Sequence, residues 1–146
     1  LATSSAASDV YKRQNRQIID DYPMELVSPV DWTDESQNIN DRVRSYLDVN
    51  CGHCHSPTGN ANSTGLYLHL DETRNIHLGL YKKPVATGRG SGGLKYSIVP
   101  GKPDESILLH RMISLDPGVM MPESGRALSH TEAVDMVREW ILVMED

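Results

Sequence analysis

The chain has 146 residues, a formal net charge of −6 and a hydrophobic content of 38%. This length suits one modest domain with additional segments, not two full domains. The acidic balance argues against a nucleic acid as the main partner, because a net positive surface is needed to neutralise phosphates. No apolar run approaches the roughly 20 residues that span a bilayer, so we expect no transmembrane segment.

The core of such a domain is expected to be thin. Phenylalanine is absent and aromatic residues make up only 5% of the chain. Small domains with few core residues usually need a disulfide, a metal or a bound cofactor. The two cysteines, Cys51 and Cys54, are so close in sequence that a disulfide between them would close a tiny loop and stabilise little. Composition therefore favours a bound group.

The first residues have an unusual sequence. Residues 4–14, SSAASDVYKRQ, resemble the in-frame translation of a transposase-type sequencing adapter, in which GAT-GTG-TAT-AAG-AGA-CAG encodes the last six residues. We expect residues 1–14 to be non-native and exclude them from fold reasoning. The native protein is then expected to continue upstream, and a signal peptide would have been lost with that region.

Residues 15–38 show no sustained hydrophobic period. They contain Pro23, Pro29 and scattered acidic residues. This composition predicts a linker, or alternatively an N-terminal arm that packs on the domain with Trp32 as its anchor. The sequence does not choose between them. The domain itself is expected to occupy residues 39–146.

Helical periodicity begins at Ile39. The apolar residues Ile39, Val43, Tyr46 and Leu47 recur at helical spacing, which predicts a helix running into Cys51. After it, alternating leucines over residues 66–70 predict a short extended piece, and the glycine-rich residues 87–93 predict a flexible loop.

Two more helices are expected downstream. Pro103 suits the first turn of a helix that continues through Met112, with Pro117 ending it. Ser129 and Glu132 form a capping box before a last helix. Its apolar face is expected to comprise Ala133, Val134, Val137, Trp140, Ile141 and Met144.

The chemistry is concentrated in one pentapeptide, Cys51-Gly52-His53-Cys54-His55. It fits the Cys-x-x-Cys-His attachment signature of c-type haem. Two thiols three positions apart at a helix can reach the two vinyl groups on one edge of a porphyrin, and His55 then offers the iron a proximal imidazole. The sequence therefore predicts one covalent haem c on Cys51, Cys54 and His55.

Two other functions of the cysteines agree less well with the surrounding sequence. A thioredoxin-like pair would follow a strand in a βαβ setting, and no such setting is present. A zinc site would need further ligands, with His69 or His77 nearest downstream, but would leave the later Pro-Gly and Met-Pro segments unexplained.

An electron carrier needs a second axial ligand. Met120-Met121-Pro122 lies between two predicted helices, where a loop could reach over the distal face, and Pro122 would hold the preceding backbone extended. We favour Met121, with Met120 as the competitor. The other methionines are expected to pack in the core, and His110 or His130 would give a bis-histidine site. Arg111, Arg126 and Tyr96 could serve the haem propionates or have no such role.

The order of these motifs resembles the cytochrome c family, and in particular the domains found at the C-terminal end of larger secreted bacterial redox proteins. The matching residues are Tyr46-Leu47, Asn50–His55, Pro100-Gly101-Lys102-Pro103 with Ser106, Arg111-Met112, Met121-Pro122 with Gly125-Arg126, and Trp140-Ile141. Two adjacent methionines before Pro122, and Glu123 where a second proline is frequent, depart from the family pattern.

The resemblance implies an all-α, cytochrome c-like helical domain wrapped around haem, with long loops and packing between the first and last helices. It also implies His55 and the methionine before Pro122 as axial ligands, and export to the periplasm or cell surface before haem attachment. The expected partner is a redox protein or a fused dehydrogenase-like domain.

We therefore expect an electron-transfer domain and not an enzyme in its own right. Two alternatives stay open. One is a haem enzyme or sensor with an open sixth position, which would bind peroxide or a small gas. The other is a docking module in which haem serves only as a structural staple.

Overall fold

A computed structural model describes residue 13 and residues 28–145. The described part is helical, with almost no strand, as the all-α expectation requires. Its α-helices are α2 (Ile39–Leu47), α3 (Asn75–Leu78), α4 (Ile107–Ile113) and α5 (Thr131–Leu142). A π-helical turn, η1 (Asp48–Gly52), and three short 3₁₀ turns complete the elements: η2 (Asn62–Thr64), η3 (Gly88–Ser91) and η4 (Pro103–Glu105).

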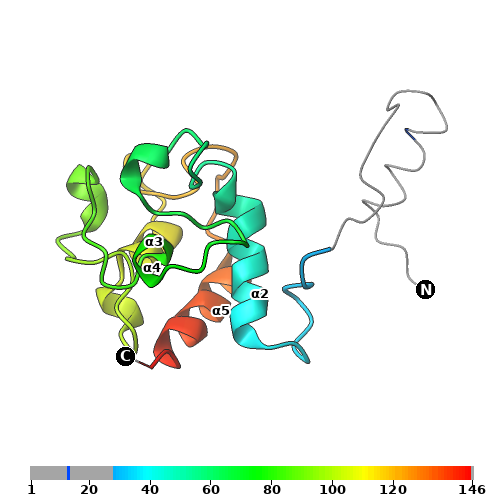
Figure 1. Ribbon diagram of the computed structural model, residues 1–146. Coiled ribbons are helices and arrows are strands. Elements are labelled where there is room, and N and C mark those ends of the chain that lie inside the picture. Colours follow the sequence, from blue (N-terminus) through cyan, green and yellow to red (C-terminus); the bar gives the residue numbers. More distant parts are fainter. Residues whose placement is uncertain (1–12, 14–27, 146) are drawn as a thin grey trace.

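Helix α5 packs against both α2 and α4 (Figure 1). The first and last helices of the described domain are also joined by a hydrogen bond of 3.1 Å, which Trp140 Nε1 donates to Asn40 Oδ1. Apolar side chains from these helices, from the extended residues 65–68 and from the segment that contains Ile98 form the core. The most deeply buried of them are Val43, Leu47, Leu68, Ile98, Leu109, Val137 and Ile141.

The loops between α2 and α4 are held mainly by isolated backbone bonds. Parallel bridges join Leu80 to Ile98 and Tyr96 to Ser106. Side chains of α2 and η1 also bind this region: Arg44 Nη2 donates to the carbonyls of His69, Leu70 and Glu72, and Asp48 Oδ1 accepts from the Leu70 N–H. These two side chains thus fix a turn that has no helix or strand of its own.

Helix α2 begins and continues as its sequence predicts. The Asn38 side chain caps it by accepting a hydrogen bond of 2.8 Å from the Asn40 backbone N–H. The helix leads directly into η1, so Cys51 lies at its end. The predicted apolar face of α5 is confirmed from Ala133 to Ile141, with Met136 buried beside it, whereas Met144 lies beyond the end of the helix and is partly buried.

Two helix starts differ from the prediction. The segment from Pro103 is divided, because Ser106 adopts an extended backbone between η4 and α4. The capping box is wrong: the Ser129 hydroxyl donates to the Met112 carbonyl, and Glu132 instead accepts a hydrogen bond from Thr131 Oγ1. In addition, residues 87–93 include the 3₁₀ turn η3.

Except for residue 13, the predicted adapter segment lies outside the described residues, as do all of residues 15–27. The arm residue Trp32 is described, and its ring packs edge-on against Tyr46 and His130, at centroid distances of 5.5 and 5.1 Å. Over the part of the chain that the structure describes, no helix is both long and apolar enough to cross a membrane.

Candidate cofactor site

The cysteine pentapeptide lies on a continuous helical turn. The backbone N–H groups of Cys54 and His55 both donate to the Cys51 carbonyl, at 3.1 and 2.8 Å. The widened turn η1 includes its first two residues, Cys51 and Gly52, and such π-turns often occur at functional sites. Helical backbone over these residues brings both thiols and the imidazole to one short stretch of surface.

Two glycines allow the close packing around this turn. A Cβ at Gly59 would lie 2.2 Å from the Cys54 carbonyl oxygen, which no side chain could accept. At Gly52 a Cβ would lie 3.3 Å from the His69 Cα, so the turn and the extended segment approach closely there. The His55 carbonyl accepts a hydrogen bond of 2.8 Å from the Leu68 N–H and anchors the same contact.

The thiol of Cys51 is not of the reactive kind. Burial, together with the neighbouring Cys54, raises the pKa of Cys51 to about 12. Nucleophilic and redox-active cysteines have lowered pKa values that favour the thiolate. Both cysteines are free, so no disulfide joins them. The raised pKa of Cys51 disfavours a thioredoxin-like function.

His55 has the properties of a ligand that is held neutral. Its side chain is partly buried, and its Nδ1 is fully buried without a hydrogen-bond partner among the described residues. Burial lowers the pKa of His55; this effect exceeds the opposing one of the Leu66 backbone, and the charge of Arg111 adds a smaller lowering. A neutral imidazole is the form that binds metals.

Met121 and Cys51 line the same small cavity. Its walls also include side chains from α2, α4, α5 and the 114–130 loop: Tyr46, Asn50, Met112, Pro122, Arg126, His130 and Val134. The cavity has a volume of only about 20 Å³. A porphyrin could enter only if the 114–130 loop, which contains no helix or strand, moved away from α2.

The two adjacent methionines have different surroundings. Met121 lines the cavity, and its N–H donates to the Arg111 carbonyl at 2.9 Å. Met120 is not part of the cavity wall, and its N–H donates to the Asp116 carbonyl. Met112 and Met136 are buried in the core, as expected for packing residues.

Arg111 and Arg126, the two arginines considered as partners for the haem propionates, both donate hydrogen bonds to backbone carbonyls. Arg111 Nε donates to the Val119 carbonyl at 2.8 Å. Arg126 donates to the carbonyls of Met112 and Ser114, at the end of α4. Both side chains therefore hold the 114–130 loop against α4.

The two predicted zinc histidines do not form a metal site with the cysteines. His69 Nδ1 is, like His55 Nδ1, buried without a hydrogen-bond partner in the described part of the chain. His77 Nδ1 lies 3.3 Å from Glu72 Oε2, and its ring packs against Tyr67. Among residues 28–145, no three His, Cys, Asp or Glu side chains gather as a potential metal site.

The sequence did not reveal an aromatic cluster beside the cavity. The Tyr46 hydroxyl and His130 Nδ1 are hydrogen-bonded at 3.1 Å, and Trp32 packs on both rings. His130, which precedes α5, lies 84 positions after Tyr46, so no local pattern links it to Tyr46 and Trp32. Tyr46 and His130 of this cluster line the cavity.

The donor set fits a c-type haem. Two free thiols at helical spacing, a buried and unpartnered imidazole nitrogen, and a thioether on the cavity wall are the groups that such a haem requires. Comparisons of the chain with protein-family models, curated proteins and solved structures found no match.

Proposed function

We propose that this chain carries one covalent haem c, bound through Cys51 and Cys54 with His55 and Met121 as axial ligands, and transfers single electrons. The observation that carries the proposal is the cysteine–histidine turn, whose partly buried His55 has a buried nitrogen without a partner. The haem would supply a one-electron couple, which an axial thioether shifts to a higher potential than a second imidazole would.

The residues around the haem would control its exposure to water and the position of its axial ligands. Met112, Val134 and Tyr46 border the cavity with apolar surface that would keep water from the group. Arg111 holds the loop that carries Met121, because its Nε bonds to Val119 and its carbonyl accepts from the Met121 N–H. The neutral state of His55 keeps its lone pair available for coordination. No proton transfer is needed, and no pair of residues is required as acid and base.

Export would accompany this function, because thioether attachment occurs outside the cytoplasm in the resembling family. The donor or acceptor would be a redox protein or a fused dehydrogenase-like domain. These assignments follow from the resemblance in motif order.

The test is expression of the full chain with export and cytochrome-maturation machinery, followed by acid–acetone extraction and a pyridine haemochrome spectrum. We expect the colour to stay with the denatured protein, with the spectrum of a haem that has two thioether links. A Cys51→Ala/Cys54→Ala variant should release its colour to the solvent. Complete extraction of colour from the parent protein would contradict the proposal.

A redox measurement separates electron transfer from the two alternatives. A carrier should exchange electrons rapidly with small redox mediators and leave peroxide unchanged. Rapid peroxide turnover would favour a haem enzyme. Slow electron exchange with the mediators together with slow peroxide turnover would favour a structural haem.

A further inference from the structure

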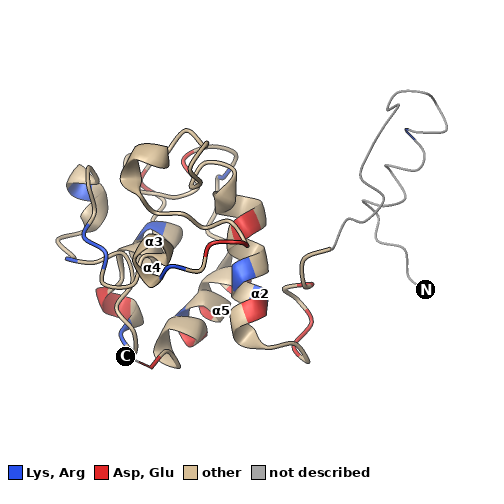
Figure 2. Cartoon of the chain, in the orientation of Figure 1, with Lys and Arg blue, Asp and Glu red and all other residues tan. Residues whose placement is uncertain are grey.

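Positive charge is concentrated in one part of this acidic chain. Residues 73–103 contain six basic residues and no acidic residue, although the whole chain has 14 basic and 20 acidic residues. This basic segment therefore has a formal charge of +6, and the rest of the chain has −12. Its cations are Arg74, Lys82, Lys83, Arg89, Lys95 and Lys102. In Figure 2 the loop that bears η3 shows blue without red, whereas red bands lie on α2, α5 and η4.

Three of these cations are used within the molecule. Arg74 pairs with Glu72 at 2.7 Å, Arg89 with Asp116 at 3.0 Å, and Lys102 with Glu105 at 3.2 Å. The other three, Lys82, Lys83 and Lys95, form no ion pair with a described acidic residue. Lys83 and Lys95 are exposed. The basic segment thus presents ammonium groups that no described carboxylate neutralises.

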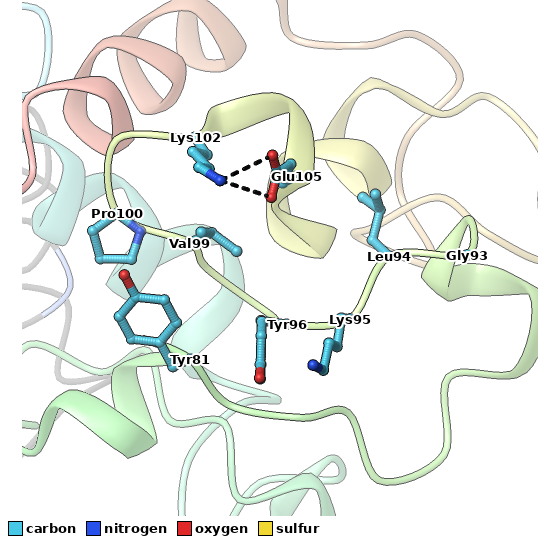
Figure 3. A pocket seen from close by; sticks show the side chains of 9 residues that line it. All are labelled: Tyr81, Gly93, Leu94, Lys95, Tyr96, Val99, Pro100, Lys102 and Glu105. Carbon is cyan, nitrogen blue, oxygen red and sulfur yellow. Dashed lines mark hydrogen bonds and ion pairs between the residues drawn. The ribbon is translucent and has the colours of Figure 1, made fainter. Parts of the chain in front are cut away.

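A groove lies within the same segment (Figure 3). It has a volume of about 570 Å³ and includes the apolar side chains of Leu94, Val99 and Pro100. Tyr81 and Tyr96 also line it. Lys95 and Lys102 stand at its border, and Glu105, which is paired with Lys102, also lines it and leaves Lys95 as the border cation without an acidic partner among the described residues. Apolar and aromatic surface flanked by lysines can hold an apolar side chain while the cations meet neighbouring acidic groups.

The arrangement of the two tyrosine rings in the groove favours one class of anionic ligand over others. Tyr81 and Tyr96 meet edge to face, at 5.8 Å and 87°, so they do not form a flat platform. Lys95 Nζ lies over the Tyr96 ring, 5.1 Å from its centroid, and covers one of its faces. Sugars and nucleobases stack on open ring faces. An acidic polypeptide with an apolar side chain matches this groove better.

We infer that the basic segment is a docking surface for an acidic polypeptide segment of a partner protein, with an aromatic or apolar side chain of that segment in the groove between Leu94 and Tyr96. Exposed lysines are strongly hydrated point charges and give fast, salt-dependent association with little demand on exact geometry. The groove adds the preference for an apolar anchor. None of the groove residues lines the Cys51–Met121 cavity, so this docking does not depend on the proposed haem.

Binding of the full chain to four immobilised polyanions tests the inference. The probes are poly-L-glutamate, a random glutamate–tyrosine copolymer, polygalacturonate and heparin, each compared over a range of salt concentration. We expect both polypeptides to bind, the copolymer more tightly at equal charge. Polygalacturonate should bind more weakly than either.

Matched variants assign that binding to the segment. Lys83→Gln/Lys95→Gln removes two positive charges, whereas Ser28→Asp/Gln37→Glu changes the net charge equally at exposed positions preceding α2. At low salt the lysine variant should bind the copolymer at least about fivefold more weakly, and the control variant within about twofold of the parent. Leu94→Asp should remove the preference for the copolymer over poly-L-glutamate.

Three results would overturn the inference. Equal losses in the two double variants would show that only net charge matters. Tighter binding of heparin or polygalacturonate than of the copolymer would assign the segment to polysaccharides or other polyanions. Failure of every probe to bind at low salt would show that the segment is not a docking surface. Haem content does not affect any of these outcomes.

Discussion

Adjacent side chains on the 114–130 loop have different surroundings, and this decides which of them could serve the proposed haem. Spacing alone was enough to single out Cys51, Cys54 and His55, because their chemistry depends on local helical geometry. It could not separate Met120 from Met121, since the loop has no period to assign a direction. The cavity wall includes only Met121. As the distal ligand, it stays a prediction.

Substitution of the two methionines tests this assignment in the haem-loaded protein. Met121→Ala should abolish the sulfur-to-iron absorption band and the low-spin signature, and should lower the reduction potential, because the iron loses its thioether. Met120→Ala, with its backbone held by Asp116, should leave all three unchanged. Absorption and magnetic spectra are the measurements. The assignment is wrong if Met120→Ala loses the band, or if the parent protein never shows it.

At the scale of elements, periodicity predicted α2 and the buried face of α5 well, because amphipathic helices signal themselves over several turns. Boundaries set by distant partners could not be predicted. Ser106 interrupts the expected helix because its buried hydroxyl accepts from the Val99 N–H and donates to the Lys102 carbonyl. Ser129 likewise bonds to Met112 on another helix instead of capping α5.

The end of α4 depends on Arg126, whose guanidinium donates to the carbonyls of Met112, which Ser129 also contacts, and Ser114. Arg126→Gln should lower the free energy of unfolding by about 1–3 kcal/mol, since it leaves partly buried carbonyls without their charged donor. Arg138→Gln is the matched control. Its ion pair with Asp104 has side chains 37% and 81% exposed, so its loss should cost less than about 1 kcal/mol. Urea denaturation measures both, and equal effects would contradict this account of the loop.

For the whole molecule, the net charge did not reveal how charge is distributed along the chain. A total of −6 conceals a segment of 31 residues without one acidic side chain. The thin core predicted from composition is consistent with the loops between α2 and α4, which rely on polar contacts such as those of Arg44 and Glu72. These contacts join residues up to 28 positions apart, so no local pattern in the sequence announces them.

One of these polar contacts makes the stability of the molecule depend on pH. The Glu72 side chain is only 3% exposed, and it accepts hydrogen bonds from the Arg74 guanidinium and from the N–H groups of Thr73 and Arg74. The Arg74 hydrogen bond is the main reason why the pKa of Glu72 lies far below its ordinary value of 4.5. In the unfolded chain the carboxylate takes up a proton near that ordinary value, so acid favours the unfolded state.

The contribution of Glu72 is therefore complete above about pH 5 and is lost progressively as the pH falls below 4.5. Glu72→Gln should lower the free energy of unfolding at pH 7 by about 1–2 kcal/mol, at the lower end for charged hydrogen bonds because Arg74 is 61% exposed. At pH 3 the parent and the variant should differ much less, whereas exposed Glu139→Gln should change little at either pH. Urea denaturation of the three proteins between pH 7 and pH 3 measures this convergence. A stability difference that stayed constant over that range would show that Glu72 acts through its shape and not through its charge.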